Sequence, residues 1–452
     1  MLHKNDVIKA DILDMGFDGE GITKVMGYTV FVKNAVKGDE AFIKILKVNK
    51  SYAYAKTEKI IKPSDMRREA VCNVFPKCGG CALMHIKYEN QLEFKENIVK
   101  NNMYKYSGLK EGDFEFNKIV GADEEYFYRN KVSIPLQNDG KNIKMGFFAK
   151  MSHRVVPFDK CYIQNEKTNE ISKICFDFIK KEKISIYDEK THRGVLRNIF
   201  IRCFDENAVL CLVANTKEKI KNADVLFDKL KKYNVTGIIQ NINTKKSNTL
   251  LGDENITLCG NEYVFANIGD LKFKISPNSF FQVNTKQTEK LYTIAKEYAG
   301  LSKNETVLDL YCGVGTITLF MAKDAGSAVG VEITKQAVEN AKENAKINGI
   351  SNASFYDGDC KDVVLNLKNS GMKFDTVVVD PPRKGCSTEV INLIEEISPK
   401  KVVYVSCNSA TLARDVKIFC EKDYKLKKLT PVDMFPQSCH VETVALLQNR
   451  NM

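Results

Sequence analysis

Residues with nucleophilic and acid–base chemistry lie at the ends of apolar runs in the last third of the sequence. Cys407 follows a strand expected at 401–406, and Glu442 opens a strand expected at 442–448. A thiolate that adds to C6 of a pyrimidine makes C5 nucleophilic, and a base must later remove the C5 proton. The two side chains therefore indicate methyl transfer to pyrimidine C5, with Cys407 as the nucleophile and Glu442 as the base.

Asp380 has a comparable position, after the apolar strand expected at 374–379. The two prolines that follow it fix a rigid loop, which would present the Asp380 carboxylate to the edge of a planar base. Each assignment has an alternative. Asp380 could belong to a simple turn, Cys407 could be a buried structural cysteine, and Cys439 is a rival thiol at the same edge.

A glycine-rich turn between a strand and a helix indicates a nucleoside cofactor. The strand expected at 306–310 runs into Gly313 and Gly315, and Glu332 ends the next strand, where an acid can hold ribose hydroxyls. Thr318 stands where a dinucleotide fingerprint has its third glycine, which weighs against NAD. The pattern favours S-adenosylmethionine over a dinucleotide or a purely structural turn.

Four cysteines have the spacing of metal ligands. Cys72, Cys78 and Cys81 lie within ten residues, and Cys161 follows after a long gap. Four thiolates can bind zinc or an iron–sulfur cluster, and the spacing does not choose between them or exclude free thiols. The chain has 14 cysteines, and most of the others lie singly in apolar segments, which is typical of reduced thiols in the cytosol.

The elements that must position these residues form three regions. Residues 1–62 contain short expected strands separated by glycines, the pattern of a small OB-like β-barrel. The expected strands are 7–14, 21–26, 29–33, 39–48 and 51–60. The lysines of this segment are compatible with a barrel that faces RNA, and a β domain without a binding role is the alternative.

From about residue 275 the pattern changes to strands that alternate with helices, which predicts an α/β Rossmann-like domain over 266–452 with a mostly parallel sheet. One helix ends at Gly300, and another spans 334–347. The expected strands are 306–310, 328–332, 374–379, 401–406 and 442–448. Ligands of such sheets bind at the carboxyl ends of the strands.

The region between these two, residues 63–265, mixes both patterns and is expected to be an α+β domain. Around 126–131 and 144–154 aromatic residues alternate with cations. Aromatic rings can stack on unpaired bases while cations contact phosphates, so the pattern is consistent with RNA binding. It is equally consistent with a half-buried pair of strands that has basic edges.

Length and composition set wider limits. The chain has 452 residues, 44% hydrophobic and 28% charged, which excludes a wholly disordered chain and predicts more than one domain. No apolar run approaches the roughly 20 residues that cross a bilayer, so we expect an unexported protein without a membrane partner. The net charge of +11 favours polyanionic partners.

Five motifs occur in an order and spacing that resemble the RNA uracil-5 methyltransferases, which make 5-methyluridine from S-adenosylmethionine. They are Phe280-Phe281-Gln282-Val283-Asn284, Asp309-Leu310-Tyr311-Cys312-Gly313, Asp380-Pro381-Pro382-Arg383, Ser406-Cys407-Asn408 and His440-Val441-Glu442. The resemblance implies Cys407 as nucleophile and Glu442 as base. It also implies a cofactor site made of Gln282, Tyr311, Thr316, Glu332, Asp359 and Asp380.

The resemblance covers nearly the whole chain. It implies that residues 1–62 are a TRAM domain, and that Cys72, Cys78, Cys81 and Cys161 hold a [4Fe-4S] cluster. It also favours 23S ribosomal RNA as the partner, with transfer RNA as the main alternative, because the best-known tRNA-specific relatives lack the barrel and the cysteines. We expect a cytoplasmic monomer. A non-catalytic iron–sulfur RNA-binding protein is the alternative from another functional class, and intact Cys407 and Glu442 weigh against it.

Overall fold

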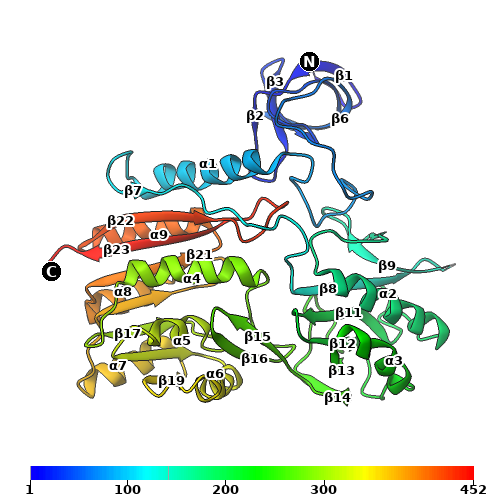
Figure 1. Ribbon diagram of the computed structural model, residues 1–452. Coiled ribbons are helices and arrows are strands. Elements are labelled where there is room, and N and C mark those ends of the chain that lie inside the picture. Colours follow the sequence, from blue (N-terminus) through cyan, green and yellow to red (C-terminus); the bar gives the residue numbers. More distant parts are fainter. Residues whose placement is uncertain (1, 141, 452) are drawn as a thin grey trace.

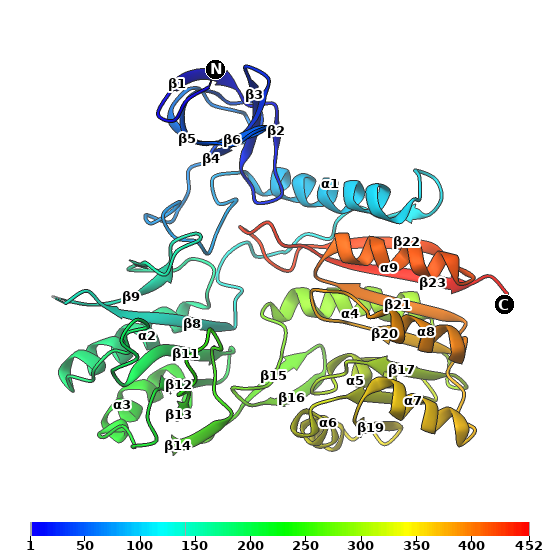
Figure 2. The same ribbon diagram turned by 180° about the vertical axis from the view of Figure 1, so that it is seen from behind.

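The computed structural model describes residues 2–140 and 142–451. The N-terminal barrel stands at one end, and two larger parts lie side by side, with a long helix along the one that holds the C-terminus (Figure 1, Figure 2). The chain is therefore multidomain, with a β-barrel, a mixed α+β part and an α/β part in sequence order.

The N-terminal part is a sheet of order β1-β5-β6-β4-β3-β2, with small apolar side chains such as Val30, Ile43 and Ala53 in its interior. Its strands are β1 (Val7–Asp11), β2 (Asp14–Met15), β3 (Gly21–Val25), β4 (Tyr28–Lys33), β5 (Glu40–Val48) and β6 (Tyr52–Lys62). The single strand expected at 7–14 was wrong. The chain changes partners there, because the Ile12 amide donates to Asp39 and the Leu13 amide donates to Ile22.

The middle part is built on a sheet of order β10-β9-β8-β11-β12-β13-β14. Helix α1 (Tyr88–Ser107) and strand β7 (Glu115–Phe116) precede this sheet in sequence but pack on the third part. The elements of the middle part are β8 (Lys131–Asn138), β9 (Ile143–Phe148), β10 (Val155–Pro157), α2 (Glu166–Lys181), β11 (Leu196–Cys203), β12 (Ala208–Ala214), α3 (Ala223–Leu230), β13 (Val235–Ile242) and β14 (Glu254–Gly260). Helices α2 and α3 cover one face. The other face packs on the third part, where Phe200 and Val209 share a core with Phe281.

The third part is a sheet of order β19-β18-β17-β20-β21-β23-β22-β7 between two layers of helices. Its elements are β15 (Val264–Ile268), β16 (Leu271–Ile275), α4 (Thr285–Ala299), β17 (Thr306–Leu310), α5 (Thr316–Ala322), β18 (Ser327–Glu332), α6 (Lys335–Ile347), β19 (Ala353–Asp357), α7 (Cys360–Asn369), β20 (Thr376–Val379), α8 (Thr388–Ile397), β21 (Lys401–Ser406), α9 (Ser409–Glu421), β22 (Tyr424–Val432) and β23 (Glu442–Asn449).

Alternate residues of each strand in the third part face opposite cores. Along β21, Val403 packs against α4, α5 and α6, whereas Val402 and Tyr404 pack against α7, α8 and α9. Two elements from before residue 120 complete this part: β7 pairs with β22 in parallel, and α1 packs on α9 through Val99 and Met103. The boundaries expected at residues 62 and 265 stay a prediction.

Candidate active site

The predicted site residues lie at one edge of the sheet. Strands β17, β18, β20 and β21 are parallel neighbours, so their carboxyl ends meet there. Tyr311, Glu332, Asp380 and Cys407 stand at or just beyond those ends. The order of the strands therefore gathers residues that are far apart in the sequence.

Glu442 joins them from the opposite direction. Strand β23 is antiparallel to β21, with Thr443 opposite Ser406, so the first residue of β23 lies at the carboxyl edge of β21. The Glu442 side chain is buried, and its Oε2 has no hydrogen-bond partner in the described structure. An unpaired buried carboxyl oxygen next to Cys407 is a feature that a bound substrate can satisfy.

One cavity of about 840 Å³ opens at this edge, between the third part, the middle part and the segment that follows the barrel. Its walls include most of the residues singled out in the sequence: Cys72, Cys78, Cys81, Cys161, Gln282, Tyr311, Glu332, Asp380, Cys407 and Glu442.

The glycine-rich turn leaves room for a ligand and orients Glu332. Gly313 has a φ of +54°, and no atom lies within 4 Å of the position that a Cβ would take. The Gly313 amide donates to Glu332 Oε2 at 3.2 Å, and the Thr334 amide donates to Oε1 at 2.9 Å. The Glu332 carboxylate is thus fixed at the cavity wall, in a position to accept hydrogen bonds from hydroxyl groups.

Two of the predicted cofactor residues do not line this cavity. The Thr316 hydroxyl pairs with the Tyr292 hydroxyl at 3.0 Å, and the Asp359 carboxylate caps α7 by accepting from the Lys361 amide at 2.9 Å. Both have a structural role in the described chain, and their assignment to the cofactor stays a prediction. Thr318 donates to the buried Asp309 at 2.6 Å, so the residue in place of a third glycine fastens α5 to β17.

Burial and mutual repulsion shift the acid–base groups. Burial raises the pKa of the Asp380 and Glu442 carboxyls, and for Glu442 the charge of Asp380 raises it further. Burial, then Glu442 and then Asp380 raise the pKa of the Cys407 thiol to about 11, while Arg383 opposes this shift. In the free protein Cys407 is therefore a thiol at neutral pH, and it must lose its proton for nucleophilic attack.

Arg383 was quoted in a motif but given no role from the sequence. It lines the cavity, and its charge lowers the pKa values of both Cys407 and Glu442. The Asn408 side chain and the Thr411 hydroxyl each donate to the Arg383 carbonyl at 3.3 Å, which ties its loop to the start of α9. The signal that could have identified Arg383 is its position three residues after Asp380, on the same rigid loop.

Cys439, the rival thiol, does not line the cavity. It packs beside Leu83 at the junction with the barrel, where a Cβ on Gly19 would lie 3.0 Å from its Sγ. Of the two thiols, Cys407 is the one that shares the cavity wall with Asp380 and Glu442.

Residues from the N-terminal quarter of the chain hold the loop that leads into Glu442. The buried Lys95 ammonium on α1 pairs with Asp433 at 2.6 Å and donates to the Phe435 carbonyl at 3.0 Å. The amides of Ala82 and Leu83, directly after Cys81, both donate to the Gln437 carbonyl at 2.9 Å. The cysteine-bearing segment therefore contacts the loop that ends at Glu442.

Cys72, Cys78, Cys81 and Cys161 are all free and share the cavity wall. Burial raises the pKa of Cys81, and the other three thiols raise it further, while the Gly80 amide donates to Cys78 Sγ at 3.4 Å. Within the described residues no three His, Cys, Asp or Glu side chains converge on a single metal ion. Four thiols on one cavity wall are the donor set of a [4Fe-4S] cluster, which takes one thiolate for each iron.

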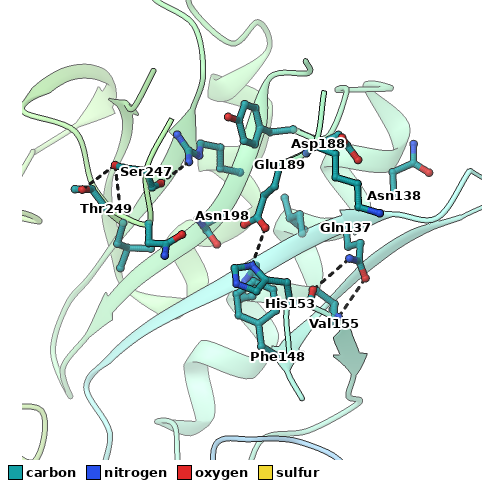
Figure 3. Close-up of a pocket in the computed structure, with 17 residues that line it drawn as sticks. Gln137, Asn138, Phe148, His153, Val155, Asp188, Glu189, Asn198, Ser247 and Thr249 are labelled. Carbon is teal, nitrogen blue, oxygen red and sulfur yellow. Dashed lines mark hydrogen bonds and ion pairs between the residues drawn. The ribbon is translucent and has the colours of Figure 1, made fainter. Parts of the chain in front are cut away.

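A second pocket, of about 280 Å³, lies on the middle part and shares no wall residue with the cavity (Figure 3). Figure 3 shows Glu189 directed at His153, with Glu189 Oε2 2.7 Å from His153 Nδ1, and Gln137 bonded to the segment that holds Val155. None of the residues predicted from the sequence as site residues belongs to it.

Two family models match the chain. The model described as tRNA (Uracil-5-)-methyltransferase matches residues 87–450, and the TRAM domain model matches residues 3–57.

Similar proteins cover almost the whole chain. An uncharacterized RNA methyltransferase of Clostridium acetobutylicum is 44% identical over 98% of this chain and 97% of its own, and one of Bacillus cereus is 41% identical over 99% and 97%. The crystal structure of the Pyrococcus abyssi tRNA (uracil-54, C5)-methyltransferase with S-adenosyl-L-homocysteine has a TM-score of 0.78 and 29% identity, covering 97% of this chain and 99% of that one.

An α/β sheet with a glycine-rich turn after β17, an acid after β18 and a cysteine beside buried carboxyls defines an S-adenosylmethionine-dependent RNA methyltransferase. The chain belongs to the tRNA (uracil-5-)-methyltransferase family and carries an N-terminal TRAM domain. Among the described helices, none is long and apolar enough to span a membrane.

Proposed function

We propose that this enzyme methylates C5 of a uridine in RNA, with Cys407 as the nucleophile and Glu442 as the base. The observation that supports this most strongly is the shared cavity wall of Cys407, Glu442 and Asp380, beside the glycine-rich turn. We assign the cofactor contacts to Gln282, Tyr311, Glu332 and Asp380, with Thr316 and Asp359 as further candidates.

Each residue has a distinct task in this reaction. The Cys407 sulfur adds to C6, and Arg383 stabilises the thiolate as it forms. S-adenosylmethionine supplies the methyl group when it is bound. Glu442 then takes the proton from C5, the C6–sulfur bond breaks, and 5-methyluridine leaves with Cys407 free. The raised pKa of the Glu442 carboxyl favours this step, because it makes the carboxylate a stronger base.

We also propose that Cys72, Cys78, Cys81 and Cys161 hold a [4Fe-4S] cluster. Supporting observations are the four free thiols on one wall and the amide that donates to the Cys78 sulfur. The cluster would cross-link the segment 72–81 to residue 161. None of the steps above requires an electron, so its role would be structural.

For the substrate we propose a uridine of 23S ribosomal RNA, on the strength of the cysteine set. Transfer RNA is the second candidate. It is favoured by the Pyrococcus abyssi tRNA enzyme, which is similar to this chain over 97% of its length, barrel included.

The two substrates are separated by mapping the modification. RNA from a strain that lacks the gene is incubated with the enzyme and methyl-labelled S-adenosylmethionine, and 23S and transfer RNA are then digested and analysed by mass spectrometry. Labelled 5-methyluridine in a 23S fragment supports the first proposal, and label confined to transfer RNA supports the second. If the wild-type enzyme labels neither while Cys407→Ala behaves identically, the proposed reaction is wrong.

A further inference from the structure

Gln437 lies in the loop that runs from β22 to Glu442, and it is completely buried. Its backbone has a φ of +71°, in the left-handed region that residues other than glycine seldom adopt. A residue stays in such a conformation when the contacts around it determine its position strongly. The surroundings of Gln437 therefore fix this point of the loop.

Both backbone polar groups of Gln437 bond to the N-terminal quarter of the chain. Its carbonyl accepts from the amides of Ala82 and Leu83, and its amide donates to Gln91 Oε1 on α1 at 3.0 Å. Gln91 Nε2 in turn donates to Gln437 Oε1 at 3.0 Å and to the Leu83 carbonyl at 3.1 Å. The loop and α1 are thus joined by a reciprocal pair of hydrogen bonds.

The side-chain amide of Gln437 is a donor and an acceptor at the same time. Its Oε1 also accepts from Arg68 Nη2 at 3.0 Å, and its Nε2 donates to Glu125 Oε2 at 3.1 Å. Arg68 and Glu125 form an ion pair with each other at 2.6 Å. An amide satisfies both partners, whereas a carboxylate in its place would face Glu125 and an ammonium would face Arg68.

The two proposed reactive residues depend on different contacts. Cys407 lies between β21 and α9, where the Asn408 side chain caps the helix by accepting from the Ala410 amide at 3.1 Å. Glu442 lies between β23, which pairs with β21, and the loop that Gln437 holds. A change at Gln437 can therefore displace the Glu442 carboxylate and leave the Cys407 thiol in place.

We infer that Gln437 is a positioning residue, which places the Glu442 carboxylate for removal of the C5 proton. It does so by fastening the loop to α1 and to the ion pair of Arg68 and Glu125. Gln437 is not among the residues that line the cavity, so it acts through Glu442. The inference rests on the proposed function, because it takes Glu442 to be the base.

The test compares two steps of the reaction in Gln437→Met, which keeps the length of the side chain and loses its hydrogen bonds. Trapping on 5-fluorouridine RNA needs addition of Cys407 and methyl transfer, but no proton removal, so its rate should match that of the wild type. Release of 5-methyluridine from ordinary RNA should slow by about 10- to 100-fold in a single turnover, because a small misplacement of a catalytic group has an effect of that size. The methylated covalent complex should therefore accumulate on a denaturing gel.

A matched control removes an equally buried glutamine from the middle part. Gln240 on β13 accepts from the Ile220 amide at 2.9 Å and donates to the Thr216 and Glu218 carbonyls at 3.0 and 2.9 Å. Gln240→Met should lower the Tm, as Gln437→Met does, but should leave the ratio of the trapping rate to the release rate unchanged. A purely structural role of Gln437 would give the same unchanged ratio.

Gln437→Glu is a second variant, for use if Gln437→Met folds poorly. It keeps the shape of the side chain and the two hydrogen bonds that Oε1 accepts, but it cannot donate to Glu125 and brings a second carboxylate beside it. Release of 5-methyluridine should slow selectively in this variant too.

Two results would overturn the inference: product release at the wild-type rate in either folded variant, or an equal slowing of trapping and product release. Failure of the proposed function has a different signature. In that case the wild-type protein forms no covalent complex with 5-fluorouridine RNA and releases no 5-methyluridine.

Discussion

Replacing Glu442 by glutamine tests the proposed roles of Cys407 as nucleophile and Glu442 as base. The amide has nearly the same shape but is a very poor base, so Cys407 can still add and the methyl group can still be transferred, while the C5 proton stays. Loss of a general base costs about 100- to 10,000-fold in rate. We expect turnover to fall within that range and a methylated protein–RNA complex to accumulate and survive denaturation.

The structure adds a second expectation for Glu442→Gln. The negative charge of Glu442 is one cause of the raised pKa of the Cys407 thiol, about 11 in the wild type. Removing that charge lowers the thiol pKa, so more thiolate is present at a given pH. The wild type can be trapped with 5-fluorouridine RNA, because fluorine at C5 cannot be removed as a proton. The covalent complex of Glu442→Gln should therefore begin to form at a lower pH than this trapped complex of the wild type.

The assay is a denaturing gel with labelled RNA, followed by mass spectrometry of the cross-linked peptide. The nucleotide should be found on Cys407, and Cys407→Ala with Glu442→Gln should give no complex. An adduct on Cys439, or turnover of Glu442→Gln within tenfold of the wild type, would refute the reasoning.

Four further changes have defined outcomes. Glu332→Ala should weaken S-adenosylmethionine binding by about 1 to 3 kcal/mol in calorimetry, because hydroxyl hydrogen bonds are lost, whereas Glu339→Ala on the surface of α6 should not. Anaerobically purified Cys78→Ser should lose iron, sulfide and brown colour, whereas Cys420→Ser should keep them; stoichiometric zinc without iron in the wild type would contradict the cluster. Lys95→Met leaves Asp433 buried without its partner and should cost about 3 to 5 kcal/mol in denaturant unfolding, compared with little change in the exposed Lys105→Met. Burial raises the pKa of the Asp380 and Glu442 carboxyls, so the folded protein binds more protons than the unfolded chain, and its stability should decline as pH rises from about 4 to 8. The Tm should fall over the same pH range, and it should fall less steeply in Glu442→Gln than in the wild type. An identical dependence of Tm on pH in the wild type and Glu442→Gln would contradict this prediction.

The alternating strands and helices of the third part could be predicted because each is a continuous local pattern. The strands expected at 306–310 and 401–406 match β17 and β21, and the helix expected at 334–347 matches α6 within one residue. Their order also indicated that Cys407 and Asp380 would share an edge, since carboxyl ends of parallel strands meet there.

The remainder depends on contacts between distant segments. β7 is only two residues long and owes its existence to β22, more than 300 residues later, so its own sequence holds no signal. The hydrogen bonds from Ala82 and Leu83 to Gln437 likewise join residues that no local periodicity connects. Thr316 and Asp359 stand next to the right turns, but their side chains bond to Tyr292 and to the amide of Lys361.

The insertion of β23 between β21 and β22 has a consequence for the timing of synthesis. A ribosome makes β21 and β22 first, but they are not neighbours in the sheet, and each gains its antiparallel partner only when β23 pairs with both of them. The same eight residues begin with Glu442, the proposed base. A nascent chain can thus form its TRAM barrel early, whereas its central sheet and the proposed pair of Cys407 and Glu442 are completed in one late step.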